Sequence, residues 1–182
     1  MSIKKFDGGP LKESVYVGID QSYSGFAITL FDPETKNHQT TVYSSKEKGT
    51  TRLKDIQNHL MDTLVMGDHK LLDVAMEGYA FGSQMANMLG ELGGMVKLTL
   101  LDFGIHPMIV PPTNLKKFVT GKGNGVPKSQ MLLFVYKKWG ETFTDDNAAD
   151  SYSLARLVSG LCETEYEKDV YDKLQHEKFR EP

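Results

Sequence analysis

The sequence of 182 residues contains a single cysteine, Cys162, and it has no long apolar run. One thiol cannot form an internal disulfide, and without a second cysteine nearby a thiolate zinc site is excluded. No apolar stretch approaches the roughly 20 residues of a membrane-spanning helix, and no apolar segment follows the basic residues near the start of the chain. We therefore expect a cytoplasmic protein without a membrane partner.

Internal repeats, low-complexity tracts and long Pro/Gly/Ser linkers are also missing. Hydrophobic residues make up 40% and charged residues 25% of the chain, values that are ordinary for a globular protein. The length suits one domain, which we place at residues 1–162. Residues 163–182 contain seven acids and four bases, so we expect a charged C-terminal helix or tail there and assign it no chemistry.

An overall excess of positive charge is missing too. The formal net charge is −3, which taken alone argues against a nucleic-acid partner. However, residues 113–140 carry +6 and the remainder of the chain −9, because this stretch has no acid and six lysines: Lys116, Lys117, Lys122, Lys128, Lys137 and Lys138. This distribution predicts a local basic surface suited to phosphates. A solvated helix face that happens to lack acids is the alternative.

The apolar pattern predicts an α/β order of three strands, a helix, a strand, a helix, a strand and several helices. The first two strands are separated by a short turn and form a predicted hairpin. We expect strands at residues 15–20, 25–31, around 41, 71–76 and 106–110. We expect helices at residues 51–66, from Ser83 to about residue 101, near residue 115, and at residues 131–139 and 148–161.

Three acids occupy positions that suit a metal site. Asp20 ends the first predicted strand, Glu77 follows the fourth, and Asp150 lies near the start of the last core helix. If the two strands are neighbours and the helix packs on the sheet, the three carboxylates meet at one edge. Such oxygens bind magnesium, and two ions can clamp the attacking and leaving oxygens of a phosphodiester. From position alone, solvated strand-end acids remain open, as does a role for Asp150 as a helix N-cap or helix-dipole partner.

Four motifs, in the same order, resemble those of the RuvC family of Holliday junction resolvases. GIDQSYSGFAITLFD resembles the first hairpin, MEGYAFG the second acidic motif, VPPTNLKKFVTGKGNGVPKSQM the basic segment, and NAADSYSLA the last acidic motif. The resemblance implies a ribonuclease H-like mixed sheet flanked by helices, and a homodimer that resolves four-way DNA junctions by paired symmetric nicks. A bacteriophage source, with activity in the host cytoplasm, is a further expectation.

The resemblance also implies roles for the acids. Asp20 would bridge two Mg²⁺ ions, with Mn²⁺ as a substitute, while Glu77 would bind one of them and Asp150 would complete the site. Asn147 stands where the family usually has Asp or His, and its neutral amide oxygen is a weaker ligand than a carboxylate. Asp146 is the alternative fourth ligand, because it is also within helical reach of Asp150.

DNA contacts follow from the same resemblance. Lys116 and Lys128 match lysines that face the DNA backbone, and Lys117 and Lys122 lie in the same basic segment. Tyr79 or Phe81 would stack on an unpaired base at the branch point, with a buried core aromatic as the alternative. The helix from Ser83 contains Gly90, Gly93 and Gly94, which permit close helix contact, so we expect it at the dimer interface.

Three other functions could use these residues. The first is a broader nuclease for flaps, forks and branches, and the second is a catalytically weak junction-binding protein that uses the same basic surface. The third is an actin-like phosphotransferase, whose opening motif is similar. Against the third, 182 residues leave no room for a second actin-like lobe, and the sequence shows no second phosphate loop.

Overall fold

The structure, a computed structural model, describes residues 1–65, 67–78 and 86–181. Within these residues one mixed sheet has the strand order β1-β4-β3-β2-β5-β6. Its strands are β1 (Ser2–Asp7), β2 (Ser14–Asp20), β3 (Phe26–Phe31), β4 (His38–Ser44), β5 (Lys70–Glu77) and β6 (Met108–Val110). The first four strands pair antiparallel, whereas β2, β5 and β6 run parallel to one another. The arrangement is the expected α/β ribonuclease H-like fold.

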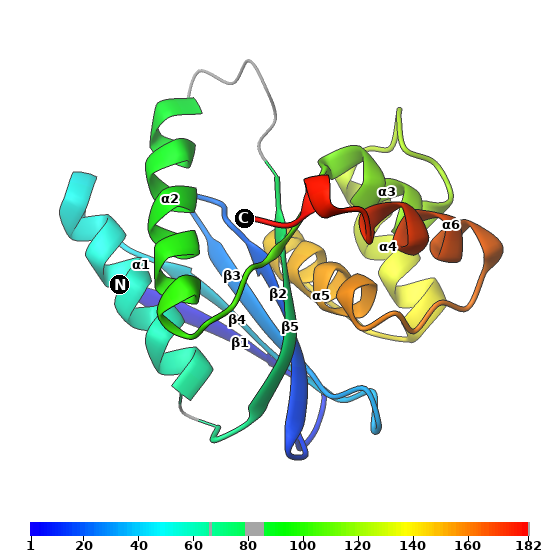
Figure 1. Ribbon diagram of the computed structural model, residues 1–182, viewed down its shortest axis with the longest axis horizontal. Helices are drawn as coiled ribbons and strands as arrows, with labels where there is room; N and C mark the ends of the chain where they lie inside the picture. Colours follow the sequence, from blue (N-terminus) through cyan, green and yellow to red (C-terminus); the bar gives the residue numbers. More distant parts are fainter. Residues whose placement is uncertain (66, 79–85, 182) are drawn as a thin grey trace.

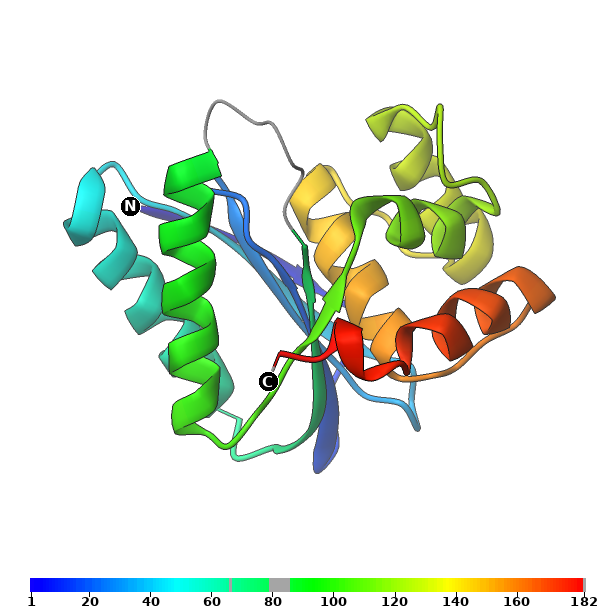
Figure 2. The same ribbon diagram turned by 45° about the horizontal axis from the view of Figure 1, so that its top comes forward.

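Helices cover both faces of this sheet (Figures 1 and 2). α1 and α2 lie side by side on one face, while α5 packs on the other with α3, α4 and α6 outside it. The described helices are α1 (Gly49–Val65), α2 (Ala86–Asp102), α3 (Pro112–Thr120), α4 (Lys128–Trp139), α5 (Asp146–Val158) and α6 (Glu165–Leu174). In the part of the chain that is described, no helix is long and apolar enough to cross a membrane.

The period-two pattern of β2 divides its side chains between two cores. Val15, Val17 and Ile19 are fully buried with the apolar faces of α1 and α2. The alternate residues Tyr16 and Gly18 face α5, so Asp20, the next residue in this alternation, belongs to the α5 face. The register of β2 therefore turns a carboxylate toward the side of the sheet that α5 covers.

Because Gly18 has no side chain, the backbone of α5 can pack directly against the backbone of β2. A Cβ atom on Gly18 would lie 2.0 Å from the backbone oxygen of Ser151 and 2.5 Å from the backbone nitrogen of Ala155. No other residue type fits here without moving the helix. Because Ser151 follows Asp150 and Gly18 is two residues from Asp20, this close packing brings the two acids to the same end of the sheet.

β1 forms one edge of the sheet, and the last described residues cover the other edge, β6. β1 is absent from the order predicted above, because its exposed and lysine-containing sequence SIKKFD has little apolar signal. At the other edge, Arg180 forms a bridge with Met108 of β6 and a two-pronged ion pair with Asp73, at 2.7 and 2.6 Å. The backbone N–H of Glu181 donates to the carbonyl of Pro107 at 3.1 Å. Residues 179–181 thus form a strap along β6.

Candidate active site

A cavity of about 390 Å³ opens at the carboxyl ends of β2 and β5. Asp20, Glu77, Asn147 and Asp150, which lie in three separate segments of the sequence, all line it together with Lys116 of α3. The remaining lining residues are Gln21, Ser22, Tyr23, Ser24, Gly78, Leu89, Pro112, Leu115 and Met131. The structure therefore brings the four residues expected at the metal site to one cavity.

Parallel pairing of β2 with β5 puts two of the acids next to each other in register. Ile19 pairs with Met76, so Asp20 and Glu77 are the next residues along two neighbouring strands. Asp20 is only 5% exposed. A carboxylate so poorly solvated is stabilised by positive charge more strongly than one in open water, which suits a cation site.

The start of α5 shows which residue is its N-cap. The N-cap is Asp145, whose side chain accepts from the backbone N–H of Asn147 at 3.1 Å and forms an ion pair with Lys4 at 2.7 Å. Asp150 is the fifth residue of this helix and lines the cavity. The alternative that Asp150 caps the helix is therefore wrong.

Asn147 and Asp146 point to different surroundings. Among the described residues, Asn147 lines the cavity and Asp146 is not part of its lining. The negative charge of Asp146 instead contributes, after the larger effect of Asp145, to raising the pKa of Lys4 on β1. A Cβ atom on Gly25 would lie 2.7 Å from the Asn147 amide nitrogen, so this glycine makes room for the Asn147 side chain beside β3.

Gln21 also lines the cavity, although it is not among the site residues predicted above. It follows Asp20, is 6% exposed, and its Nε2 donates to the backbone carbonyl of Glu77 at 2.6 Å. Its Oε1 is buried without a hydrogen-bond partner among the described residues. The only sequence signal is its position after the acid, because the contact with Glu77 joins segments 56 residues apart.

The aromatic side chain that the structure places at the cavity is Tyr23. The guanidinium of Arg52 lies 4.7 Å from the centre of the Tyr23 ring and donates to the carbonyl of Ser45 at 2.7 Å. The sequence did not single out this pair, since α1 supplies the arginine and the hairpin supplies the ring. Tyr79 and Phe81, expected to stack on a base, lie outside the described residues.

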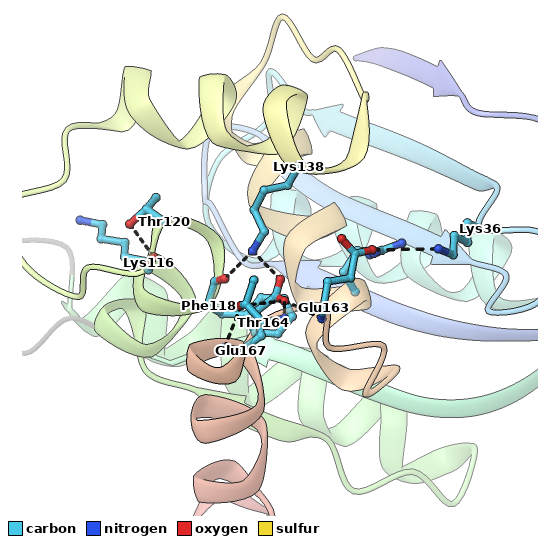
Figure 3. Close-up of polar contacts among 9 residues, drawn as sticks. Lys36, Lys116, Phe118, Thr120, Lys138, Glu163, Thr164 and Glu167 are labelled. Carbon is cyan, nitrogen blue, oxygen red and sulfur yellow. Dashed lines mark hydrogen bonds and ion pairs between the residues drawn. The ribbon is translucent and has the colours of Figure 1, made fainter.

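The lysines of residues 113–140 separate into two groups. Lys116 lines the cavity, Lys117 is half-buried, Lys122 is exposed, and Lys128 is the first residue of α4, with a side chain outside the description. Lys138 instead points inward, where it pairs with the buried carboxylate of Glu167 and donates to the carbonyl of Phe118 (Figure 3). Lys138 is therefore not part of the predicted basic surface.

The donor set of the cavity suits a hard divalent cation. It consists of three carboxylates and two side-chain amides, all oxygen donors of the kind that Mg²⁺ prefers. Across residues 1–65, 67–78 and 86–181, no three His, Cys, Asp or Glu side chains form a group that could hold a metal ion. Mg²⁺ commonly binds through one or two carboxylates and takes its other ligands from water and substrate phosphates. The residues present fit that type of binding.

Solved structures provide the comparison for this arrangement. The chain is similar to the structure of RuvC from Thermus thermophilus, with 18% identity, a TM-score of 0.64, and coverage of 92% of this chain and 99% of that one. The chain has a RuvC-like fold. The T. thermophilus RuvC in complex with Holliday junction substrate gives 18% identity, a TM-score of 0.66, and coverage of 93% and 99%. No protein-family model matches the sequence, and no curated protein matches it either.

In this RuvC-like fold the cavity lies where β2, β5 and α5 converge, with α3 of the basic segment at its rim. The hairpin, second acidic motif and last acidic motif supply Asp20, Glu77, Asn147 and Asp150 to one place. An identity of 18% supports the fold alone.

Proposed function

We infer that the protein is an endodeoxyribonuclease that resolves branched DNA, four-way junctions above all. The observation that carries this proposal is the convergence of Asp20, Glu77, Asn147 and Asp150 on one cavity, beside Lys116, in a RuvC-like fold. The similarity to a RuvC in complex with a Holliday junction supports DNA as the substrate. Acids alone would repel a phosphodiester, so the site needs both the lysine and bound cations.

In the proposed site, Asp20, Glu77 and Asp150 would hold Mg²⁺ with help from the amide of Asn147. Ions bound there would supply an activated water and stabilise the leaving 3′ oxygen. Burial of Asp20 keeps its carboxylate in a poorly solvated place where it attracts a cation strongly. Lys116 on the rim attracts the DNA backbone and orients the scissile phosphate. The expected product is a nick with a 5′ phosphate that a ligase can rejoin.

A homodimer would give the two sites that paired nicks require. The surface of α2 supports it, because Leu98 is 65% and Leu101 51% exposed, more than large apolar side chains usually are. A Cβ atom at Gly90 or Gly94 would meet nothing within 4 Å, so a second helix can approach there. We place α2 at the twofold axis. The bacteriophage source stays a prediction.

Cleavage of defined DNA substrates tests the proposal. The purified chain is incubated with labelled four-way junction, flap and linear duplex, each with Mg²⁺, Mn²⁺ or a chelator. We expect paired symmetric nicks in the junction, only when a divalent cation is present. Equal cutting of flaps and forks would indicate the broader branch nuclease, and junction binding without cleavage would indicate a structural junction-binding protein.

A further inference from the structure

Gln21 connects the two strand ends that carry the acids. Its Nε2 donates to the Glu77 carbonyl at 2.6 Å, one residue beyond Ile19 and Met76, the last backbone pair of β2 and β5. The side chain therefore extends the link between β2 and β5 past the point where backbone pairing stops. This contact fixes the separation of Asp20 and Glu77, because Gln21 is the neighbour of Asp20 in the chain and its side chain bonds the backbone of Glu77.

The other half of the same amide, Oε1, has no hydrogen-bond partner within residues 1–65, 67–78 and 86–181. A backbone carbonyl can only accept a hydrogen bond, so the NH₂ group of Gln21 must face Glu77 and the orientation of the amide is set. Oε1 then lies on the opposite side, buried, without a hydrogen bond among the described residues, in a side chain that lines the cavity. Buried acceptors left unsatisfied are rare and costly, so this oxygen is expected to have a donor in the working protein.

We propose that Gln21 is a positioning residue for the divalent cation, whose bound water donates a hydrogen bond to Gln21 Oε1. This rests on the proposed nuclease function. Mg²⁺ releases its waters reluctantly and keeps several of them when carboxylates bind it. An acceptor held rigidly beside Asp20 and Glu77 orients such a water and so helps to fix the ion. If Gln21 only tethered the ends of β2 and β5, its Nε2 would suffice, and Oε1 would be buried without a hydrogen bond at a cost in stability.

Two variants separate the acceptor role of Oε1 from the tether, which is the hydrogen bond from Nε2 to the Glu77 carbonyl. Gln21→Met has a similar length and loses both functions, whereas Gln21→Glu loses the donor to Glu77 and retains an oxygen that accepts. Gln175→Met is the matched control, because Gln175 also donates its Nε2 to a backbone carbonyl, that of Tyr171, on an exposed surface. Folding of each variant is checked by circular dichroism.

Mn²⁺ binding to the full chain without DNA is measured by calorimetry and by electron paramagnetic resonance. Gln21→Met should weaken binding about tenfold, the lower end of what loss of an outer-shell partner costs. Gln21→Glu should bind as tightly as the unaltered protein or more tightly, and Gln175→Met should not change. Equal weakening in Gln21→Glu and Gln21→Met would leave only the tether and overturn the proposal, as would unaltered binding in a folded Gln21→Met.

A second measurement needs no variant. Adding Mg²⁺ to the unaltered protein should shift the carbonyl ¹³C resonance of the Gln21 side chain and leave that of Gln175 in place. An unmoved Gln21 resonance under conditions where Mn²⁺ binds overturns the role of Gln21 alone. If the unaltered protein binds neither ion, the metal-dependent function fails together with this inference.

Discussion

Asp20, Glu77 and Asp150 each place a carboxyl group in the cavity, and an amide of nearly the same shape can replace each of them. We therefore expect Asp20→Asn, Glu77→Gln or Asp150→Asn to remove junction cleavage and leave junction binding largely intact. The measurement is a single-turnover cleavage assay beside a gel-shift titration with Ca²⁺ or chelator. Asp169→Asn, on the exposed side of α6, is the control and should cleave normally. Near-wild-type cleavage by any one of the three would remove that residue from the site.

The choice between Asn147 and Asp146 can be made in the same assay. Asn147 lines the cavity, whereas the charge of Asp146 acts on Lys4. Asn147→Asp should keep or raise activity and lower the Mg²⁺ concentration for half-maximal cleavage, since a carboxylate binds Mg²⁺ better than an amide does. Asp146→Ala should be mild. A severe loss in Asp146→Ala, with Asn147→Ala near wild type, would reverse the assignment.

We expect the lysines of the basic segment to bind DNA by contacting the phosphates of its backbone. Lys116→Ala and Lys128→Ala should each weaken DNA binding and reduce its salt dependence, because one lost phosphate contact removes about one counterion from the slope. Binding is measured by fluorescence anisotropy over a series of salt concentrations. Lys173→Ala on the exposed side of α6 is the control. An unchanged slope in both variants would show that the segment faces away from DNA.

Among the elements, α5 determines the geometry of the site through its contact with β2. Gly18→Ala would force a Cβ atom to within 2.0 Å of the Ser151 backbone oxygen, and backbone cannot rotate away as a side chain can. We expect a loss of stability of about 1–3 kcal/mol or more, typical of overpacking, measured by urea unfolding.

Gly90→Ala on α2 is the comparison for this substitution within one chain, because a Cβ atom there meets nothing within 4 Å. Unfolding is measured at a protein concentration low enough to keep the chain monomeric, since the same Cβ atom would face the proposed partner helix. Alanine in a helix interior is favoured over glycine by roughly 1 kcal/mol, so this variant should be neutral or more stable. Equal stability of Gly18→Ala and the unaltered protein would mean that α5 can move off β2 at little cost. Asp20 and Asp150 would then not be held together by packing.

The elements also differ in how well their sequences predict them. β2 and β3 are largely buried, β5 is buried over its residues 74–76, and all three are rich in apolar residues, so their positions, the hairpin of β2 and β3 and the acids at the ends of β2 and β5 followed from the sequence. β1 did not, because an exposed edge strand such as SIKKFD needs little apolar pattern. Neither Gln21 nor the inward turn of Lys138 could be predicted, since each depends on a contact with a distant segment, at Glu77 and Glu167 respectively.

At the scale of the whole molecule, a buried polar chain crosses the layer between α5 and the sheet. Ser151 bonds Thr29 at 2.9 Å, Thr29 bonds Thr40 at 2.8 Å, Thr40 bonds His38 at 3.0 Å, and His38 reaches Glu141 at 3.2 Å. Burial lowers the pKa of His38 and outweighs the carboxylate of Glu141, which raises it. The imidazole is therefore held neutral inside the fold.

This burial gives the fold a pH dependence with a defined sign. A group whose folded pKa is depressed takes up a proton more readily when the chain unfolds, so its contribution is present above the ordinary histidine value of 6.5 and is lost below it. Burial lowers the pKa of His59 in the same direction. We expect the melting temperature to fall from pH 7 to pH 5. His38→Gln should reduce that slope, whereas the exposed His106→Gln should leave it unchanged.

The strap of residues 179–181 along β6 has a practical consequence for anyone who shortens this protein. β6 has only three residues, and the bridge to Arg180 and the bond from Glu181 occupy polar backbone groups that would otherwise face a neighbouring molecule. The opposite edge, β1, has Lys4 and Lys5 to discourage such pairing. Trimming the last few residues would therefore leave an unpaired sheet edge that favours aggregation, in a chain whose candidate site is untouched, and affinity tags are better placed on the lysine-bearing N-terminal side.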